Sequence, residues 1–90
     1  MALNTKFKQQ LKAKAHKLKP IVFIGNNGLT DNVKMEIDRG LTDHELIKIR
    51  VQSSDRELKQ QLLVEACHAT DAELVQCIGG IAVLYRKNLE

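Results

Sequence analysis

Apolar residues recur at helical spacing near the start of the chain. Over residues 4–18, four of them fall on one face at intervals of three or four residues: Phe7, Leu11, Ala15 and Leu18. Asn4 or Thr5 can cap this segment. The spacing therefore predicts an amphipathic helix over residues 4–18, followed by a break at Pro20.

The next apolar run is continuous. Residues 21–24 are Ile-Val-Phe-Ile, which predicts a short strand buried on both faces. The run leads into Gly25-Asn26-Asn27-Gly28, residue types that tolerate positive φ and leave little bulk over the backbone. Taken alone, this loop favours an ordinary turn over a ligand site by roughly two to one.

A second helix is predicted from Asp31 to Leu41, with Thr30 as its cap. Its inward stripe consists of Val33, Ile37, Gly40 and Leu41. Gly40 either ends this helix or allows a close approach to the sheet. Residues 42–44 (Thr-Asp-His) then predict a polar turn.

Beyond residue 44 the pattern gives strand, helix and a final hairpin. Residues 46–52 alternate, which predicts a half-exposed strand with Lys48 and Arg50 on its open face. Ser54 and Glu57 have the spacing of a capping box, opening a helix to about residue 69. The expected inward positions of this helix are Leu58, Leu62, Ala66 and Ala69, with Leu63 and Cys67 widening the stripe. Strands 72–78 and 81–86 flank Gly79-Gly80, a two-residue hairpin signal.

The order of elements is thus α-β-α-β-α-β-β within one domain, residues 1–90. Helical crossovers imply parallel pairing, and the closing hairpin adds an antiparallel pair. We expect an α/β fold with a four-stranded mixed sheet and helices packed on it.

Charge changes the picture, because its distribution is lopsided. Residues 1–30 hold six Lys and no acid, whereas residues 31–90 hold eight Lys or Arg against eleven Asp or Glu. This asymmetry is compatible with three kinds of binding partner: an extended polyanion, an acidic protein or an anionic membrane. Aromatics make up only 3% of the chain, which argues against single-strand binding built on rows of aromatic side chains.

Candidate metal and catalytic groups are poorly placed. Cys67 and His68 diverge by about 100° around a helix, and His16 and His44 lack partners at ligand spacing. The glycine loop lacks the Lys and Ser/Thr of a P-loop. No cofactor, metal or catalytic residue is expected. For Cys67 and Cys77 we favour free thiols in a reducing compartment over a disulfide.

Membrane binding would need the apolar residues of the first helix, which the core requires, and we expect neither a signal peptide nor a membrane-spanning run. We therefore expect a cytoplasmic protein without a membrane partner. Phosphate binding needs only the lysine heads: Lys8 and Lys12 flank one side of the apolar stripe, as does Lys19 if the helix reaches that far. Together with the loop they make a coherent site for RNA phosphates.

Several separated motifs resemble one known family. They are H-K-L-K-P-I-V-F-I-G-N-N-G-L-T (16–30), H-E-L-I-K-I (44–49), D-R-E (55–57) and V-L-Y-R (83–86). Across the whole chain they resemble the CRM domain, in particular the free-standing bacterial YhbY-like proteins. The resemblance implies a fold similar to the C-terminal domain of the third bacterial translation initiation factor.

It also implies RNA binding through a G-x-x-G loop and a basic surface, in association with precursors of the large ribosomal subunit. Carried onto this sequence, the loop is Gly25, Asn26, Asn27 and Gly28, with Lys19 before its strand and Arg86 at the end of the last strand. We expect a monomeric, non-catalytic RNA-binding protein of ribosome assembly. The alternative is a module that docks an acidic ribosomal or assembly-factor protein surface, and an enzyme comes third.

Overall fold

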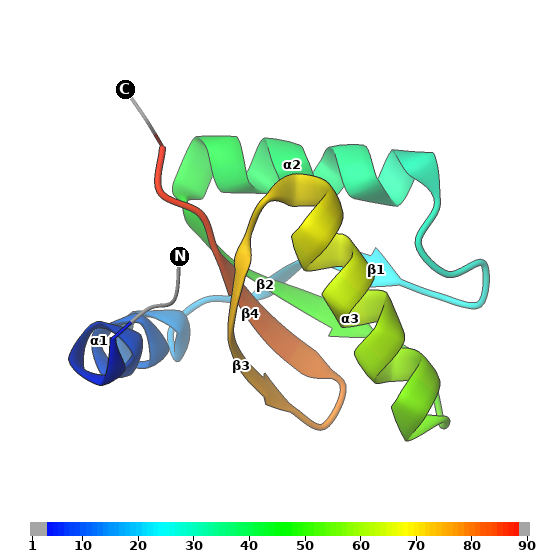
Figure 1. Cartoon of the computed structure of the whole chain (residues 1–90), viewed down its shortest axis with the longest axis horizontal. Helices are drawn as coiled ribbons and strands as arrows, with labels where there is room; N and C mark the ends of the chain where they lie inside the picture. The colour runs from blue at the N-terminus through cyan, green and yellow to red at the C-terminus, as the bar shows by residue number, and fades with distance from the viewer. Residues whose placement is uncertain (1–3, 89–90) are drawn as a thin grey trace.

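The computed structural model describes residues 4–88 as one α/β unit (Figure 1). Its elements in chain order are α1 (Thr5–Ala15), β1 (Pro20–Ile24), α2 (Asp31–His44), β2 (Leu46–Val51), α3 (Arg56–Thr70), β3 (Glu73–Ile78) and β4 (Ile81–Tyr85). The predicted order and fold class are confirmed, and the strand ends differ from the predicted ones by about one residue.

The four strands form one mixed sheet in the order β1-β2-β4-β3. β1 pairs with β2 in parallel, whereas β4 pairs antiparallel with both β2 and β3. The crossover through α2 and the closing hairpin therefore produce the predicted parallel and antiparallel pairings.

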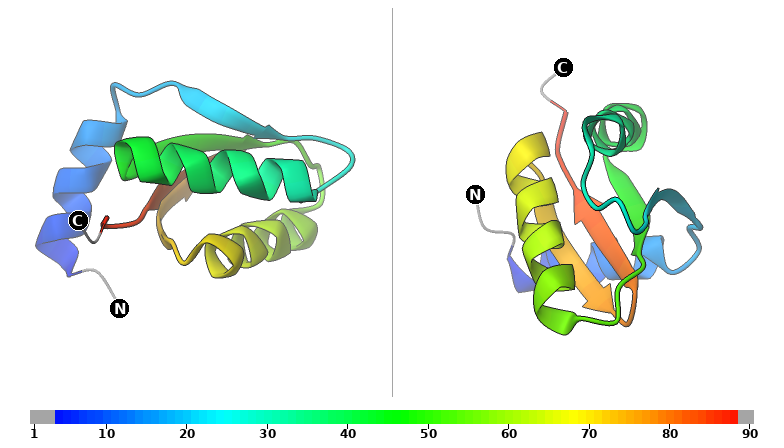
Figure 2. Two further views of the ribbon diagram at one scale, coloured as in Figure 1. Left: turned by 90° about the horizontal axis from the view of Figure 1, so that it is seen from above. Right: turned by 90° about the vertical axis from the view of Figure 1, so that its right-hand side faces the viewer.

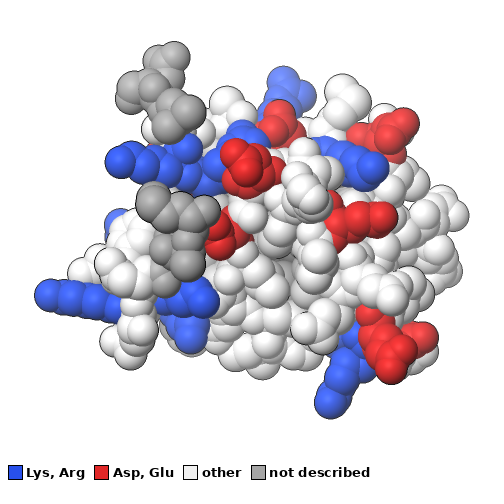
Figure 3. Space-filling view, viewed as in Figure 1, with Lys and Arg blue, Asp and Glu red and all other residues white. Residues whose placement is uncertain are grey.

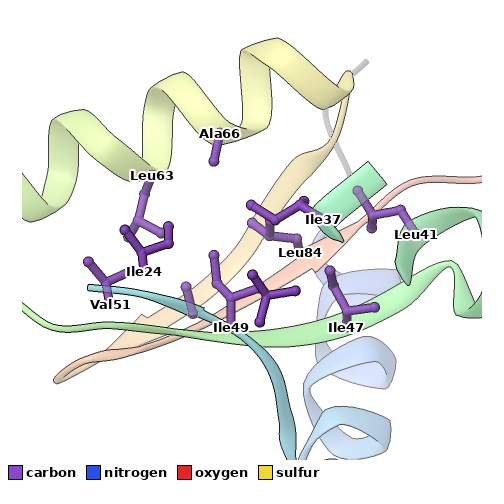
Figure 4. Close-up of a cluster of buried hydrophobic side chains, with 11 residues drawn as sticks. Ile24, Ile37, Leu41, Ile47, Ile49, Val51, Leu63, Ala66 and Leu84 are labelled. Atoms are coloured by element: carbon purple, nitrogen blue, oxygen red, sulfur yellow. The ribbon is translucent and has the colours of Figure 1, made fainter. Parts of the chain in front are cut away.

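Helices cover both faces of the sheet, but unequally. α2 and α3 pack on one face and form the main core, which includes Ile24, Ile37, Leu41, Ile49, Leu63 and Leu84 (Figure 4). α1 lies at one end of the sheet, as the additional views show (Figure 2). Its Leu11 and Ala15 pack on Val75 and Val83 in a second, smaller cluster. No other helix of residues 4–88 covers the rest of that face.

Side-chain caps explain where the helices begin. The backbone N–H of Phe7 donates to Asn4 Oδ1 (2.7 Å), and that of Val33 donates to Thr30 Oγ1 (3.2 Å). Both predicted caps are confirmed. The predicted Ser54 capping box is wrong, because Asp55 is the cap and its carboxylate accepts the N–H groups of the first helical turn.

The inward face of α3 matches the predicted stripe at Leu63 and Ala66 but differs at its two ends. Leu63, Ala66 and Thr70 are buried, whereas Leu58 and Ala69 are exposed. This helix packs on α2 as well as on the sheet, so its buried stripe follows both neighbours. Thr70 tolerates burial because its hydroxyl donates to the Ala66 carbonyl oxygen (2.7 Å).

The ends of the first two helices differ from the predicted ones. α1 stops at Ala15 with His16 as its C-cap, so Leu18 lies beyond the helix and is exposed. α2 continues to His44 and ends at Glu45, where φ is +64°. The polar triplet at residues 42–44 is therefore the last turn of a helix, because exposed polar residues suit that position as well as a loop.

β1 is not buried on both faces. Val22 and Ile24 are buried, but Ile21 and Phe23 are 52% and 51% exposed. The exposure of Phe23 has a long-range cause: β1 is an edge strand, and the helix on the second face does not extend over it. Ile21 lies where the β1–β2 register shifts, and its side chain points toward α2 at Gly40. Gly40 allows the close approach of α2, since a Cβ there would lie 2.9 Å from Ile21 Cδ1.

Candidate nucleic-acid interface

The loop between β1 and α2 is a tight turn that exposes the side-chain amides of two asparagines. The Gly28 N–H donates to the Gly25 carbonyl oxygen (3.0 Å), and Gly28 has φ +73°, which favours glycine. Asn26 and Asn27 stand exposed at its tip. Backbone and side-chain donors are therefore available here to a phosphate or another acceptor.

The adjoining helix adds little positive potential. The N–H of Thr30 donates to the Gly28 carbonyl oxygen (3.1 Å), and Asp31 lies in the first turn of α2. A carboxylate at this position offsets the partial positive charge of the helix N-terminus. The loop is therefore better suited to positioning an anionic chain than to attracting one.

The predicted cations lie away from this loop. Lys12 is exposed and Lys8 half-buried on α1, and Lys19 is exposed just before β1. α1 lies at the opposite end of the molecule from the β1–α2 loop, as Figure 1 and the left view of Figure 2 show. The structure thus separates the two parts of the predicted site and joins them only through β1.

The two ends of the molecule also differ in charge. α1 contains four lysines and no acid. Lys and Arg side chains project from that end of the molecule, whereas Asp and Glu side chains are mixed with Lys and Arg over α2 and α3 (Figure 3). The acid-free α1 end therefore attracts a polyanion more strongly than the two other helices do.

Arg86 is bound into the fold. Its Nη1 donates to Asp38 Oδ1 (2.6 Å) and to the Thr70 carbonyl oxygen (2.8 Å). Its Nη2 donates to the Asp38 carbonyl oxygen (3.1 Å) and to Thr42 Oγ1 (2.8 Å). These contacts join the strand end to α2 and α3, so the structure gives Arg86 an internal role that sequence reasoning missed. No local signal predicts it, because its acceptors are 16 to 48 residues away.

The cysteines are free, as favoured from the sequence. Burial, with a smaller contribution from the Glu73 carboxylate, raises the pKa of the Cys67 thiol from 9.0 to about 11. Within residues 4–88, no three His, Cys, Asp or Glu side chains are grouped so as to hold a metal ion. None of the helices in this range has the length and apolar content needed to span a bilayer.

Comparison with known proteins gives consistent matches over nearly the whole chain. The family model described as CRS1 / YhbY (CRM) domain matches residues 3–86. A Haemophilus influenzae protein named "RNA-binding protein" is 50% identical over 88 residues, which cover 98% of this chain and 89% of that protein. A Pseudomonas aeruginosa protein named "Probable RNA-binding protein" is 44% identical over 88 residues, covering 98% and 85%.

A solved structure shares the fold. The solution structure of the Staphylococcus aureus protein SAV1595 has a TM-score of 0.85 to this chain at 38% sequence identity. The match covers 99% of this chain and 93% of that one. The arrangement of three helices on a four-stranded mixed sheet is therefore common to both proteins.

Proposed function

Because this chain belongs to the CRS1 / YhbY (CRM) domain family, we propose that it is a non-catalytic protein that binds RNA through the phosphate backbone. The observation that carries the proposal is the 50% identity, over nearly the full length of both proteins, to a relative named RNA-binding protein. The acid-free lysine helix and the exposed turn supply chemistry suited to that ligand.

In this proposal the two ends of the molecule act differently. The lysines of α1 and Lys19 neutralise phosphates and supply most of the affinity. The turn at residues 25–28 holds a second part of the backbone and fixes its position. Since the long axis of the molecule measures 33 Å, one RNA must span much of the domain to contact both.

We assign the RNA to large-subunit rRNA within ribosomal precursors, and the protein to ribosome assembly as a cytoplasmic monomer. This assignment rests on the resemblance to bacterial YhbY-like proteins. Co-sedimentation of the tagged protein with large-subunit precursors, followed by sequencing of crosslinked RNA, tests it. Crosslinks confined to mRNA or to the small subunit would overturn the assignment and leave RNA binding itself intact.

The lysine contribution is tested by salt dependence. The triple variant K8A/K12A/K19A should bind RNA with a shallower plot of log affinity against log salt, each lost contact removing a slope of about 0.7–0.9. The control K34A/R39A/R56A removes three positive charges from α2 and α3, and we expect it to keep the slope. Equal slopes in all three proteins would show that Lys8, Lys12 and Lys19 are merely solvated.

The loop contribution is tested by adding negative charge at its tip. The variant N26D/N27D should fold normally, because both side chains are exposed, and it should bind RNA more weakly. The control Q60E/Q61E adds the same charge on exposed positions of α3. Equal loss of affinity in the two variants would assign the effect to net charge and remove the loop from the interface.

The alternative, docking on an acidic protein surface, makes a different prediction. Binding to ribosomal particles would then persist while binding to naked rRNA would be lost. Titration of both with the purified protein separates the two functions.

A further inference from the structure

On the sheet face that carries α1, a row of side chains crosses the strands outside both hydrophobic clusters. Consecutive Cα partners link Phe23 on β1 to Arg50 on β2, Arg50 to Ile81 on β4, and Ile81 to Ile78 on β3. Partners in register point to the same face, so these four residues cross the whole sheet in one line. Phe23 is 51% and Ile78 66% exposed.

This row lies beside α1 rather than beneath it. The α1 cluster takes Val75 and Val83 from the same face, but Phe23 and Ile78 belong to neither hydrophobic cluster. Single exposed apolar residues are ordinary on a protein surface. Here an aromatic ring, a guanidinium and two isoleucines stand in register, which gives a continuous platform with a cation within it.

The platform has a basic rim. A groove of about 250 Å³ at the C-terminal end of α1 has Ile78 and Ile81 in its floor, with Lys12, His16 and Lys48 around it. No carboxylate is among the described residues that line this groove. An apolar surface edged by cations complements a ligand with a flat, weakly polar body and negative charges beside it.

The platform is also continuous with both parts of the proposed interface. Lys12 of α1 borders its groove. At the other end, a Cβ added to Gly25 would lie 3.3 Å from Phe23 Cε2, so the ring rests against the first glycine of the loop. An RNA chain that contacts the loop and the α1 lysines must therefore pass over or next to this row.

We infer that the row is a stacking site for an unpaired base of the RNA, with the base on the Phe23 ring and the Arg50 guanidinium next to it. This inference rests on the proposed function and deepens it. Aromatic rings and guanidinium planes both stack on nucleobases, whose faces are hidden inside a continuous duplex. The protein should therefore prefer RNA with single-stranded or bulged nucleotides to a blunt duplex of equal charge.

Fluorescence gives a direct test, because the chain contains no tryptophan. F23W places a single indole in the row, and V64W places one at an exposed position of α3 as a control. An unstructured oligoribonucleotide should quench F23W strongly and V64W little, whereas a blunt duplex should quench neither. Binding of the oligonucleotide without quenching of F23W would overturn the stacking site.

Affinity supplies a second, independent measurement. F23A should weaken binding of the same oligonucleotide by about 5- to 150-fold, the loss found when an aromatic under a base is truncated, and should leave duplex binding unchanged. F23L keeps apolar bulk, and we expect it to restore only part of this loss. Circular dichroism and urea titration check that both variants fold.

The possible failures are distinguishable. If wild-type protein binds RNA and F23A binds both ligands equally well, the stacking site is wrong and the proposed function stands. If F23A weakens both ligands by the same factor, the ring has no role specific to unpaired bases. If wild-type protein binds no RNA at all, the proposed function fails and the inference fails with it.

Discussion

Removing the guanidinium of Arg86 should destabilise the fold without weakening RNA binding. Arg86 donates four hydrogen bonds, two of them to Asp38 and one each to Thr42 and Thr70. They hold the end of β4 against the C-terminal turns of α2 and α3. R86M keeps most of the apolar stem and removes every donor.

The expected loss of stability is about 2 kcal/mol. The ion pair contributes only about 0.5 kcal/mol, because the Asp38 side chain is 59% exposed. The Thr70 carbonyl oxygen is partly buried, and leaving such an acceptor unpaired costs about 1 kcal/mol or more. The Thr42 hydroxyl is exposed and can turn to water, so it adds a few tenths of a kcal/mol. In a domain of this size, a loss of 2 kcal/mol lowers Tm by about 8–16 °C.

Urea unfolding followed by circular dichroism measures this loss, and RNA titration at low temperature measures affinity on the folded variant. R86K separates the two roles. A lysine keeps the positive charge for a phosphate but cannot reproduce the fork that reaches Asp38, Thr42 and Thr70 together. R86K should therefore lose more than 1 kcal/mol of stability and bind RNA as the wild type does.

The opposite pattern would refute this reasoning. If R86M unfolds at the wild-type urea concentration but binds RNA with a shallower salt dependence, the guanidinium is free for phosphate. Arg86 would then act as the resemblance to the family implied. The variant D38N, which removes only the ion pair, should cost less than 1 kcal/mol in either case.

Further expectations concern packing and the thiols. G40A should raise the free energy of unfolding by about 0.5 kcal/mol in urea titration. Alanine is more favourable than glycine in a helix by about 1 kcal/mol, and part of this gain is lost because the half-exposed Ile21 side chain must move aside. The larger G40V should instead destabilise it by at least about 1 kcal/mol, since its extra carbons meet the buried Ile47. The raised pKa of Cys67, about 11, implies that stability falls as pH rises from about 9, because the unfolded chain loses this proton first. C67A should reduce this alkaline loss, and at pH 8 iodoacetamide should modify the exposed Cys77 well before Cys67.

Sequence patterns predicted the elements whose causes are local. The caps at Asn4 and Thr30 depend on a side chain three residues from its donor. The alternation in β2 depends on neighbouring residues, as does the hairpin at Gly79-Gly80, where Gly79 has φ +59°. Such short-range causes are visible in any window of the chain.

What could not be predicted depends on elements far apart in the sequence. A run of four apolar residues does not reveal that β1 is an edge strand, so the exposure of Ile21 and Phe23 was missed. The same limit applied to Arg86, whose partners come from α2 and α3. It applied most to the candidate site, because lysines and loop that are close in sequence lie at opposite ends of the molecule (Figure 1).

The platform at Phe23 and Arg50 shows where a signal was present but incomplete. The alternation of residues 46–52 placed Arg50 on an open face, and Phe23 was visible in the preceding strand. The register between β1 and β2 makes them neighbours, and no local pattern contains that register. A scarcity of aromatic residues therefore argues against many stacking sites, but a single ring in the right row is enough for one base.

The separation of loop and lysines also predicts how affinity depends on RNA length. An oligonucleotide too short to span the 33 Å axis can contact only one end of the molecule. With such a ligand, K8A/K12A/K19A and N26D/N27D should not both weaken binding, because at least one set is out of reach. As the RNA is lengthened, both sets should become effective together, since joining two contacts makes the second intramolecular and raises affinity beyond either alone. F23A should remain effective at each length that covers the row between them. If all three variants weaken the shortest bound RNA equally, the contacts are adjacent in the complex, and a single compact site must replace the extended path.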